Sequence, residues 1–207
     1  MSFLKKVNHV RCRDKKSFDF LLKNKLKNAS FSLDDATFIP KIGQDDFVLL
    51  KEKNNINKKY VVLSLHDWYD SDKTAFLQEC KKSTDDLLKK GCQVVLLGNK
   101  IKNKMNDIIF LSSFKNNYYP DNEDVILLTP PYRSNVSKTI ISNSELLITT
   151  RYHPAIFAYE EKIPVIALAY DAYYIQKFEG ALISREDKKY LIMKFNEFSN
   201  KEVNKLF

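Results

Sequence analysis

The chain has 207 residues and a net charge of +8, with 34 Lys and Arg residues against 26 Asp and Glu residues. Its 44% hydrophobic content excludes an intrinsically disordered chain. Its four glycines form neither a GxGxxG fingerprint nor a P-loop. No stretch approaches the ~20 apolar residues of a membrane span, and the N-terminus lacks the apolar segment of a signal peptide. We therefore expect a cytoplasmic protein without a transmembrane segment.

The positive charge is spread along the chain. Only five cationic residues are arginines, and the lysines are interleaved with acidic residues and with the Asn and Ile that A/T-rich codons favour. A nucleic-acid surface usually gathers arginine and aromatic residues, so no nucleic-acid partner is expected. Cys12, Cys80 and Cys92 form no CxxC pair, and the three histidines have no acidic residue at ligand spacing. We expect neither a disulfide framework nor a metal site.

The N-terminal part is predicted to hold short elements. Val7–Val10 is a candidate strand, and Ser17–Leu26 is a candidate helix capped by Asp14 or Ser17. The polar and charged run Lys51–Lys59 is typical of a linker or a long loop.

From residue 60 onwards, short apolar runs alternate with helical patterns. Strands are expected at Tyr60–Leu65, Gln93–Leu97, Asp107–Leu111, Val125–Leu128, Leu146–Thr150 and Pro164–Tyr170. Helices are expected at Ser71–Lys90, Pro130–Asn143 and His153–Lys162, with two or three amphipathic helices in Tyr173–Phe207. This alternation predicts an α/β fold, a Rossmann-like parallel sheet with helices on both faces.

One strand end carries the strongest candidate site. In an open parallel sheet, ligands bind beyond the carboxyl ends of the strands, against helix N-termini. Arg151 and His153 follow the strand at 146–150, and Pro154 makes His153 the expected N-cap of the next helix. A cation 4 Å from a phosphate charge contributes ~4 kcal/mol at an effective dielectric near 20, so Arg151 would dominate anion binding.

The charge of the helix end predicts a lowered pKa for His153, unless a bound anion raises it. The alternative for this strand end is structural: Arg151 forms a salt bridge within the fold and His153 caps its own helix. Two more positions lie at the same predicted edge. His66 ends the first strand and could supply a second acid or base, or form only a polar turn, and Asp171 follows the last strand.

Four segments carry a resemblance. Ser144–Leu182 resembles the C-terminal signature of the polysaccharide pyruvyl transferase family. The matching positions are Arg151, His153, Ala155, Phe157, Ala158, Pro164, Val165, Ala167, Tyr170, Asp171 and Phe178. Val10–Ser17 is similar to the family's RDeeS segment, Asp34–Phe38 to its pDpaf stretch, and Tyr60–Trp68 to its vavslRpw strand and turn. The order and spacing of the segments agree over nearly the whole chain.

The resemblance implies a GT-B-like protein of cell-surface polysaccharide synthesis, with two Rossmann-like domains and the active site between them. Such proteins transfer the enolpyruvyl group of phosphoenolpyruvate, a co-substrate, to two hydroxyls of a sugar as a cyclic ketal, and no other cofactor is expected. The resemblance makes Arg151 the anion clamp and His153 the general acid or second donor. It makes Arg13 an extra contact from the other domain. It makes Asp171 a further substrate-binding candidate, with the alternative that Asp171 only shapes the loop. His66 stands where arginine is common.

The resemblance also suggests a domain division. Residues 1–46 are expected to be a remnant of an N-terminal domain, 47–59 a linker, 60–183 the Rossmann-like domain and 184–207 C-terminal helices. A partner chain could supply the missing N-terminal half. Two alternatives stay open: a non-catalytic truncated or companion subunit, and a GT-B glycosyltransferase that uses a nucleotide sugar.

Overall fold

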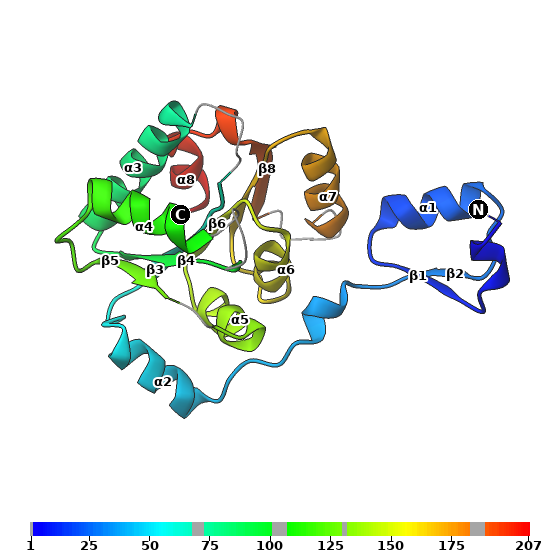
Figure 1. Ribbon diagram of the computed structural model, residues 1–207, viewed down its shortest axis with the longest axis horizontal. Coiled ribbons are helices and arrows are strands. Elements are labelled where there is room, and N and C mark those ends of the chain that lie inside the picture. Colours follow the sequence, from blue (N-terminus) through cyan, green and yellow to red (C-terminus); the bar gives the residue numbers. More distant parts are fainter. Residues whose placement is uncertain (1, 68–72, 101–106, 130–131, 183–188) are drawn as a thin grey trace.

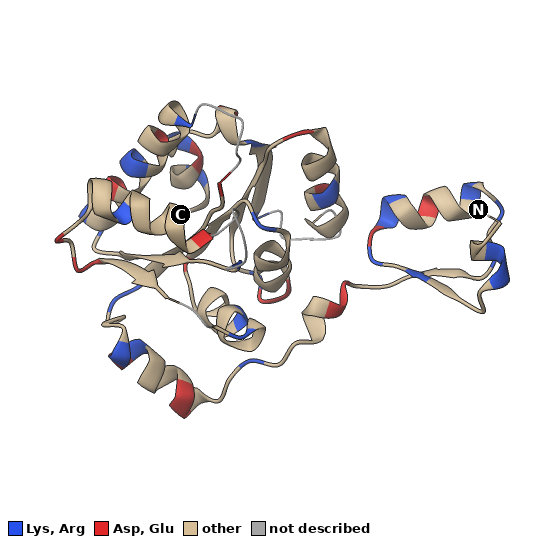
Figure 2. Ribbon diagram, in the orientation of Figure 1, with Lys and Arg blue, Asp and Glu red and all other residues tan. Residues whose placement is uncertain are grey.

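The computed structural model describes residues 2–67, 73–100, 107–129, 132–182 and 189–207. It holds a small N-terminal unit with two strands and a main domain with a six-stranded sheet (Figure 1). Lys and Arg residues are interleaved with Asp and Glu along the helices of both parts (Figure 2). Among the helices of the described residues, none is both long and apolar enough to cross a membrane.

The six strands of the main sheet are all parallel to their neighbours and lie in the order β5-β4-β3-β6-β7-β8. Their bounds are β3 Tyr60–Ser64, β4 Gln93–Leu97, β5 Val125–Leu128, β6 Leu146–Thr149, β7 Val165–Ala169 and β8 Tyr190–Lys194. The chain builds outward from β3 to β5 and then returns to place β6 on the other side of β3. Such a reversal opens a crevice at the carboxyl ends of β3 and β6.

Both faces of the sheet are covered, which explains the continuous apolar strands. Val62 belongs to one core cluster, and Val61 and Leu63 belong to the other, as the two-residue period of a strand requires. The first cluster includes residues of α2 (Gln44–Lys53), α5 (Ser134–Ser142), α6 (Tyr152–Glu160) and α7 (Ala172–Leu182). The second includes residues of α3 (Thr74–Lys89), α4 (Asp107–Tyr118) and α8 (Asn200–Leu206). The predicted fold class is confirmed.

The N-terminal unit is built around a parallel pair of strands. It comprises η1 (Leu4–Lys6), β1 (Val10–Cys12), α1 (Lys15–Lys23) and β2 (Ala29–Phe31). Asp14 caps α1, since its carboxylate accepts a hydrogen bond from the Ser17 amide at 2.7 Å, so the first of the two predicted caps is confirmed. Cys12, Leu21 and Leu26 form a small core of their own. In Figure 1 the unit lies at the α7 end of the main domain.

The segment expected as a linker over 47–59 is partly helical. After η2 (Asp35–Phe38), α2 spans Gln44–Lys53. Phe47 and Ile56 are buried in the core of the main domain. The segment has a polar composition because Phe47 is the single fully buried side chain of α2. The domain boundaries themselves remain predictions.

Two expected elements are wrong. Asp107–Leu111, expected as a strand, forms the start of α4, in which Leu111 and Phe114 are buried. A short apolar run does not distinguish a strand from a buried helical segment. The tail 184–207, expected as helices, contains β8, which pairs with β7, before α8 begins. The helix expected from Pro130 begins at Ser134, and residues 130–131 lie outside the described residues.

Candidate functional site

Three cavities that share lining residues lie near the start of α6, at the carboxyl edge of the sheet. The large cavity, with a volume of about 730 Å³, lies between the N-terminal unit and α7. The middle cavity, about 490 Å³, lies beside η2 and the start of α5. The third, about 270 Å³, is called the anion cavity because its lining includes Lys100, Arg151 and Lys177. Tyr152 and Lys177 line both the large cavity and the anion cavity. His153 lines the middle and anion cavities, and Asp34 lines the large and middle cavities. Ligands in neighbouring cavities would therefore lie side by side.

Arg151 is held by the fold in one orientation. It is the N-cap of α6, and its amide donates to Thr149 Oγ1 at 2.9 Å. Its guanidinium pairs with Asp107, with Nε 3.1 Å from Oδ2 and the second bond running from NH2 to Oδ1. The expected alternative of a salt bridge within the fold is therefore present. The side chain of Arg151 keeps 20% of its surface exposed and lines the anion cavity.

Asp107, which sequence reasoning missed, is the partner that orients Arg151. Its carboxylate is fully buried and also accepts the amides of Asn99 and Lys100, both at 3.0 Å. The sequence pattern places Asp107 at the start of a predicted strand and gives it no functional role. Its position just before an apolar run also fits the first turn of a helix, where acidic residues are favoured, and this pattern could have indicated the helix.

His66 is a buried neutral base in this structure. Its Nδ1 lies 2.7 Å from Thr150 Oγ1, and its backbone amide donates to the same oxygen at 3.0 Å. Burial, with the positive charges of Arg151 and Lys100 adding to it, lowers the pKa of His66 to about 3. His66 lines the anion cavity beside Arg151, so the two predicted residues are brought together.

His153 lies at the second position of α6, and Arg151 rather than His153 is the N-cap. The expected cap is wrong because the helical geometry already includes Tyr152. The His153 ring is exposed and meets the Tyr152 ring edge to face, with centroids 5.6 Å apart. Partial burial lowers the pKa of His153, while Asp34 opposes this shift and Arg13 and Lys177 add to it. His153 is therefore mainly a neutral base near pH 7.

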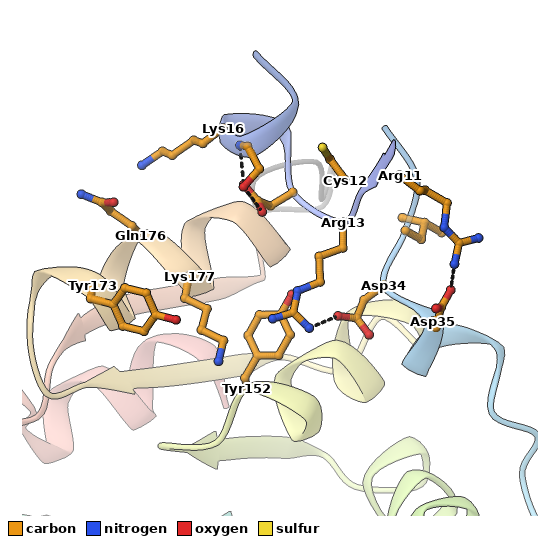
Figure 3. A pocket seen from close by; sticks show the side chains of 13 residues that line it. Arg11, Cys12, Arg13, Lys16, Asp34, Asp35, Tyr152, Tyr173, Gln176 and Lys177 are labelled. Carbon is orange, nitrogen blue, oxygen red and sulfur yellow. Dashed lines mark hydrogen bonds and ion pairs between the residues drawn. The ribbon is translucent and has the colours of Figure 1, made fainter. Parts of the chain in front are cut away.

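Arg13 comes from the N-terminal unit and reaches the same group of side chains. It pairs with Asp34 at 3.0 Å, and its guanidinium lies over the Tyr152 ring, 4.8 Å from the centroid. Lys177 of α7 lies over the same ring at 4.7 Å. Figure 3 shows the Arg13 and Lys177 side chains both directed towards Tyr152. Sequence reasoning missed Lys177, because a single lysine in a predicted amphipathic helix carries no signal of its own.

Asp171 has a local structural role. It is exposed, and its Oδ1 accepts the amide of Tyr174 at 2.9 Å at the start of α7. None of the three cavities, as defined by the described residues, includes Asp171 in its lining. The geometry agrees with the expected part in shaping the loop and separates Asp171 from Arg151 and His153.

The anion cavity concentrates positive charge. Lys100, Arg151 and Lys177 line it together with His66 and His153, and the described lining residues include no carboxylate. The start of α6 adds the positive end of the helix dipole. Within the described ranges, no group of three or more His, Cys, Asp or Glu is placed to hold a metal ion. The chemistry that this cavity supports is the binding of a small anion.

The fold is similar to that of GT-B-type epimerases and heptosyltransferases. A UDP-GlcNAc 2-epimerase from Methanocaldococcus jannaschii, solved with UDP-GlcNAc and UDP, shares 13% identity with a TM-score of 0.65, over 96% of this chain and 53% of that chain. An ADP-heptose heptosyltransferase II from E. coli shares 10% identity with a TM-score of 0.59, over 80% of this chain and 51% of that chain. The chain thus spans about half the length of these two structures.

The family itself is shown by sequence. A family model described as polysaccharide pyruvyl transferase matches residues 1–172, so the chain belongs to that family.

The C-terminal domain of a group 1 glycosyl transferase from Francisella tularensis is also similar in fold, with 15% identity, a TM-score of 0.52 and coverage of 84% of this chain and 85% of that chain. No curated protein matches the chain. The chain is accordingly a member of a polysaccharide-modifying transferase family with a GT-B-like domain.

Proposed function

We propose that this protein takes part in the transfer of the enolpyruvyl group of phosphoenolpyruvate to two hydroxyls of a sugar, giving a cyclic ketal and phosphate. The anion cavity is the observation that carries the proposal. Phosphoenolpyruvate carries a phosphate and a carboxylate, and the cavity offers Lys100, Arg151 and Lys177 in a volume of about 270 Å³. The reaction is proposed to serve cell-surface polysaccharide synthesis in the cytoplasm.

Arg151 and the lysines would share the work of anion binding. Because Asp107 already balances the charge of Arg151, the guanidinium supplies direction and hydrogen-bond donors more than net charge. Lys100 and Lys177 then supply net attraction. Their charges, which no carboxylate of the described lining balances, would attract a dianion into the cavity.

His153 is the proposed proton donor. In the free protein the pKa of His153 lies below the ordinary value, but a phosphate dianion in the anion cavity, which His153 lines, would raise this pKa and favour the protonated ring. The imidazolium then gives its proton to the methylene carbon of phosphoenolpyruvate. The first sugar hydroxyl bonds through its oxygen to the resulting cationic carbon and returns its proton to the neutral His153 ring. Phosphate leaves with the electron pair of its carbon–oxygen bond, and the second hydroxyl oxygen bonds to the same carbon and closes the ketal, its proton passing to the released phosphate.

The chain spans about half of two similar GT-B structures. We therefore also propose that a second polypeptide chain contributes part of the binding site for the sugar acceptor. A non-catalytic companion role predicts that phosphoenolpyruvate binds without phosphate release.

The test is phosphoenolpyruvate binding by calorimetry, which needs no acceptor, followed by phosphate release with a panel of glycan acceptors. We expect Arg151→Ala to weaken binding at least tenfold and His153→Ala to lower phosphate release with a smaller effect on binding. Arg133→Ala, an exposed arginine outside the three cavities, and His9→Ala are the matched controls. Equal binding by Arg151→Ala and wild type would overturn the site. Binding of UDP-sugars in place of phosphoenolpyruvate would instead support the nucleotide-sugar alternative.

A further inference from the structure

The large cavity has a composition unlike that of the anion cavity. Its walls come from the N-terminal unit, from η2 and from α7, and it shares Tyr152 of α6 and Lys177 of α7 with the anion cavity. Its volume of about 730 Å³ falls within the usual range for small-molecule sites. A ligand in this cavity would lie next to one in the anion cavity, on the other side of Tyr152 and Lys177.

The charges around the large cavity are balanced in pairs. Arg11 is paired with Asp35, and Arg13 is paired with Asp34. Lys16, a third cation of the lining, is paired with Glu179 of α7, and the fourth, Lys177, is matched in number by Asp14. Because these cations are already matched by carboxylates, the lining attracts an anion less strongly than the anion cavity does. It suits instead a neutral ligand with many hydroxyls, which can donate to carboxylates and accept from guanidinium and ammonium groups.

One face of α7 provides an aromatic surface. Tyr173, Gln176 and Lys177 line the cavity at positions i, i+3 and i+4, which lie on the same side of a helix. The Tyr173 side chain is 65% exposed, and its ring is supported edge to face by Tyr174 with centroids 5.5 Å apart. Figure 3 shows the Tyr173 ring beside Lys177, across the cavity from Arg13 and Asp34. An exposed ring with a polar tip can contact the apolar face of a sugar.

The wall opposite α7 is fixed by close backbone packing. A Cβ at Gly180 would lie 2.8 Å from Asp14 Cβ, so glycine is needed for the start of α1 to approach α7. The Lys16–Glu179 pair joins the same two helices. The N-terminal unit therefore forms a wall of the cavity through specific contacts with α7.

We propose that the large cavity binds the neutral sugar unit that accepts the pyruvyl group, with Tyr173 as its stacking surface. Asp34, whose carboxylate is held by Arg13 and by the Ala36 amide, forms part of the cavity wall facing the middle cavity. The proposal rests on the proposed function. Asp34 connects the two sites: it lines the large cavity, and together with His153 it lines the middle cavity. A sugar in the large cavity would therefore be separated from the proposed proton donor by the wall that contains Asp34.

The experiment is saturation-transfer NMR on the full chain, with methyl glucoside, galactoside and mannoside as neutral probes and glucose 1-phosphate as the anionic probe. We expect at least one neutral probe to bind, and binding to weaken about tenfold in Tyr173→Ala and to be kept in Tyr173→Phe. The matched control is Phe20→Ala, because Phe20 is an exposed aromatic residue of α1 outside the cavity lining. Phosphoenolpyruvate should leave the sugar signal in place, because the two ligands occupy different cavities.

Four results would overturn the assignment: no binding of any neutral probe, binding of glucose 1-phosphate alone, equal binding by Tyr173→Ala and wild type, or displacement of the sugar by phosphoenolpyruvate. A failure of the proposed function can be distinguished from a failure of the sugar-site assignment. If phosphoenolpyruvate does not bind by calorimetry while neutral sugars bind and respond to Tyr173→Ala, the cavity is a sugar site and the pyruvyl donor is wrong.

Discussion

The guanidinium of Arg151 forms an ion pair with the carboxylate of Asp107, which is completely buried. The same carboxylate accepts the amides of Asn99 and Lys100, so it joins the segment after β4 to the start of α4 and to the end of β6. This arrangement fixes the direction of Arg151 and reduces the net charge that it can offer a ligand. Orientation of the anion site therefore depends on a residue that does not line the cavity.

Asp107→Asn should destabilise the fold. The substitution leaves Arg151 without its counter-charge in a site where 80% of the arginine side chain is covered, and removing one partner of a buried pair is strongly destabilising. We expect the free energy of unfolding to fall by about 2–4 kcal/mol, measured by urea denaturation. Asp121→Asn, an exposed position, is the control and should change stability by under about 0.5 kcal/mol. Equal stability of both variants would contradict the structural role of the pair.

Phosphoenolpyruvate binding should take up a proton at His153. Because the pKa of His153 is lowered in the free protein and raised by a bound anion, affinity should decrease as pH rises between these two pKa values. Calorimetry in buffers of different ionisation enthalpy should show about one more proton taken up by wild type than by His153→Gln. The comparison with His153→Gln removes the titration of the ligand itself. Identical proton uptake in the two proteins would exclude His153 as the group that ionises.

His66 should make the fold sensitive to acid. Its pKa is lowered to about 3 in the folded protein, so between the ordinary pKa and 3 the unfolded chain binds a proton that the folded chain does not. This contribution reduces stability as pH falls, by at most about 1.4 kcal/mol per pH unit. Urea denaturation between pH 7 and pH 4 should show a shallower loss in His66→Asn, which keeps a polar group near Thr150, than in wild type. His9→Asn should behave as wild type.

Gly180→Ala should destabilise the contact between α1 and α7. Alanine in a helix interior ordinarily stabilises by roughly 0.5–1 kcal/mol relative to glycine. Here the added methyl group would meet Asp14 Cβ at 2.8 Å, so we expect a lower melting temperature. Gly43→Ala is the steric control, since its Cβ would have only an ordinary contact at 3.7 Å. Gly43 is the N-cap of α2, where alanine is less favourable than glycine, so a small decrease in melting temperature is expected there. A raised melting temperature in Gly180→Ala would show that the two helices are not in contact in solution.

Much of the main domain could be predicted because its signals are local. The strands at Tyr60–Ser64 and Val165–Ala169 are continuous apolar runs, and such runs follow directly from burial on both faces of a parallel sheet. The start of α4 is not predictable in this way, because the short run Asp107–Leu111 is compatible with a strand and with a buried helical segment. β8 was missed because it is an edge strand with mostly half-buried side chains and no alternation.

The sequence by itself determined the fold class and the position of Arg151 and His153 at a strand-to-helix junction, because periodicity and the order of elements depend on neighbouring residues. Only the tertiary structure decided what surrounds them: Asp107 behind Arg151, Lys177 beside Tyr152, and Arg13 paired with Asp34. These contacts join residues that are 21 to 44 positions apart, or lie on separate helices. Ion pairs and ring contacts at such separations follow from how helices pack on the sheet, and no local pattern encodes that packing.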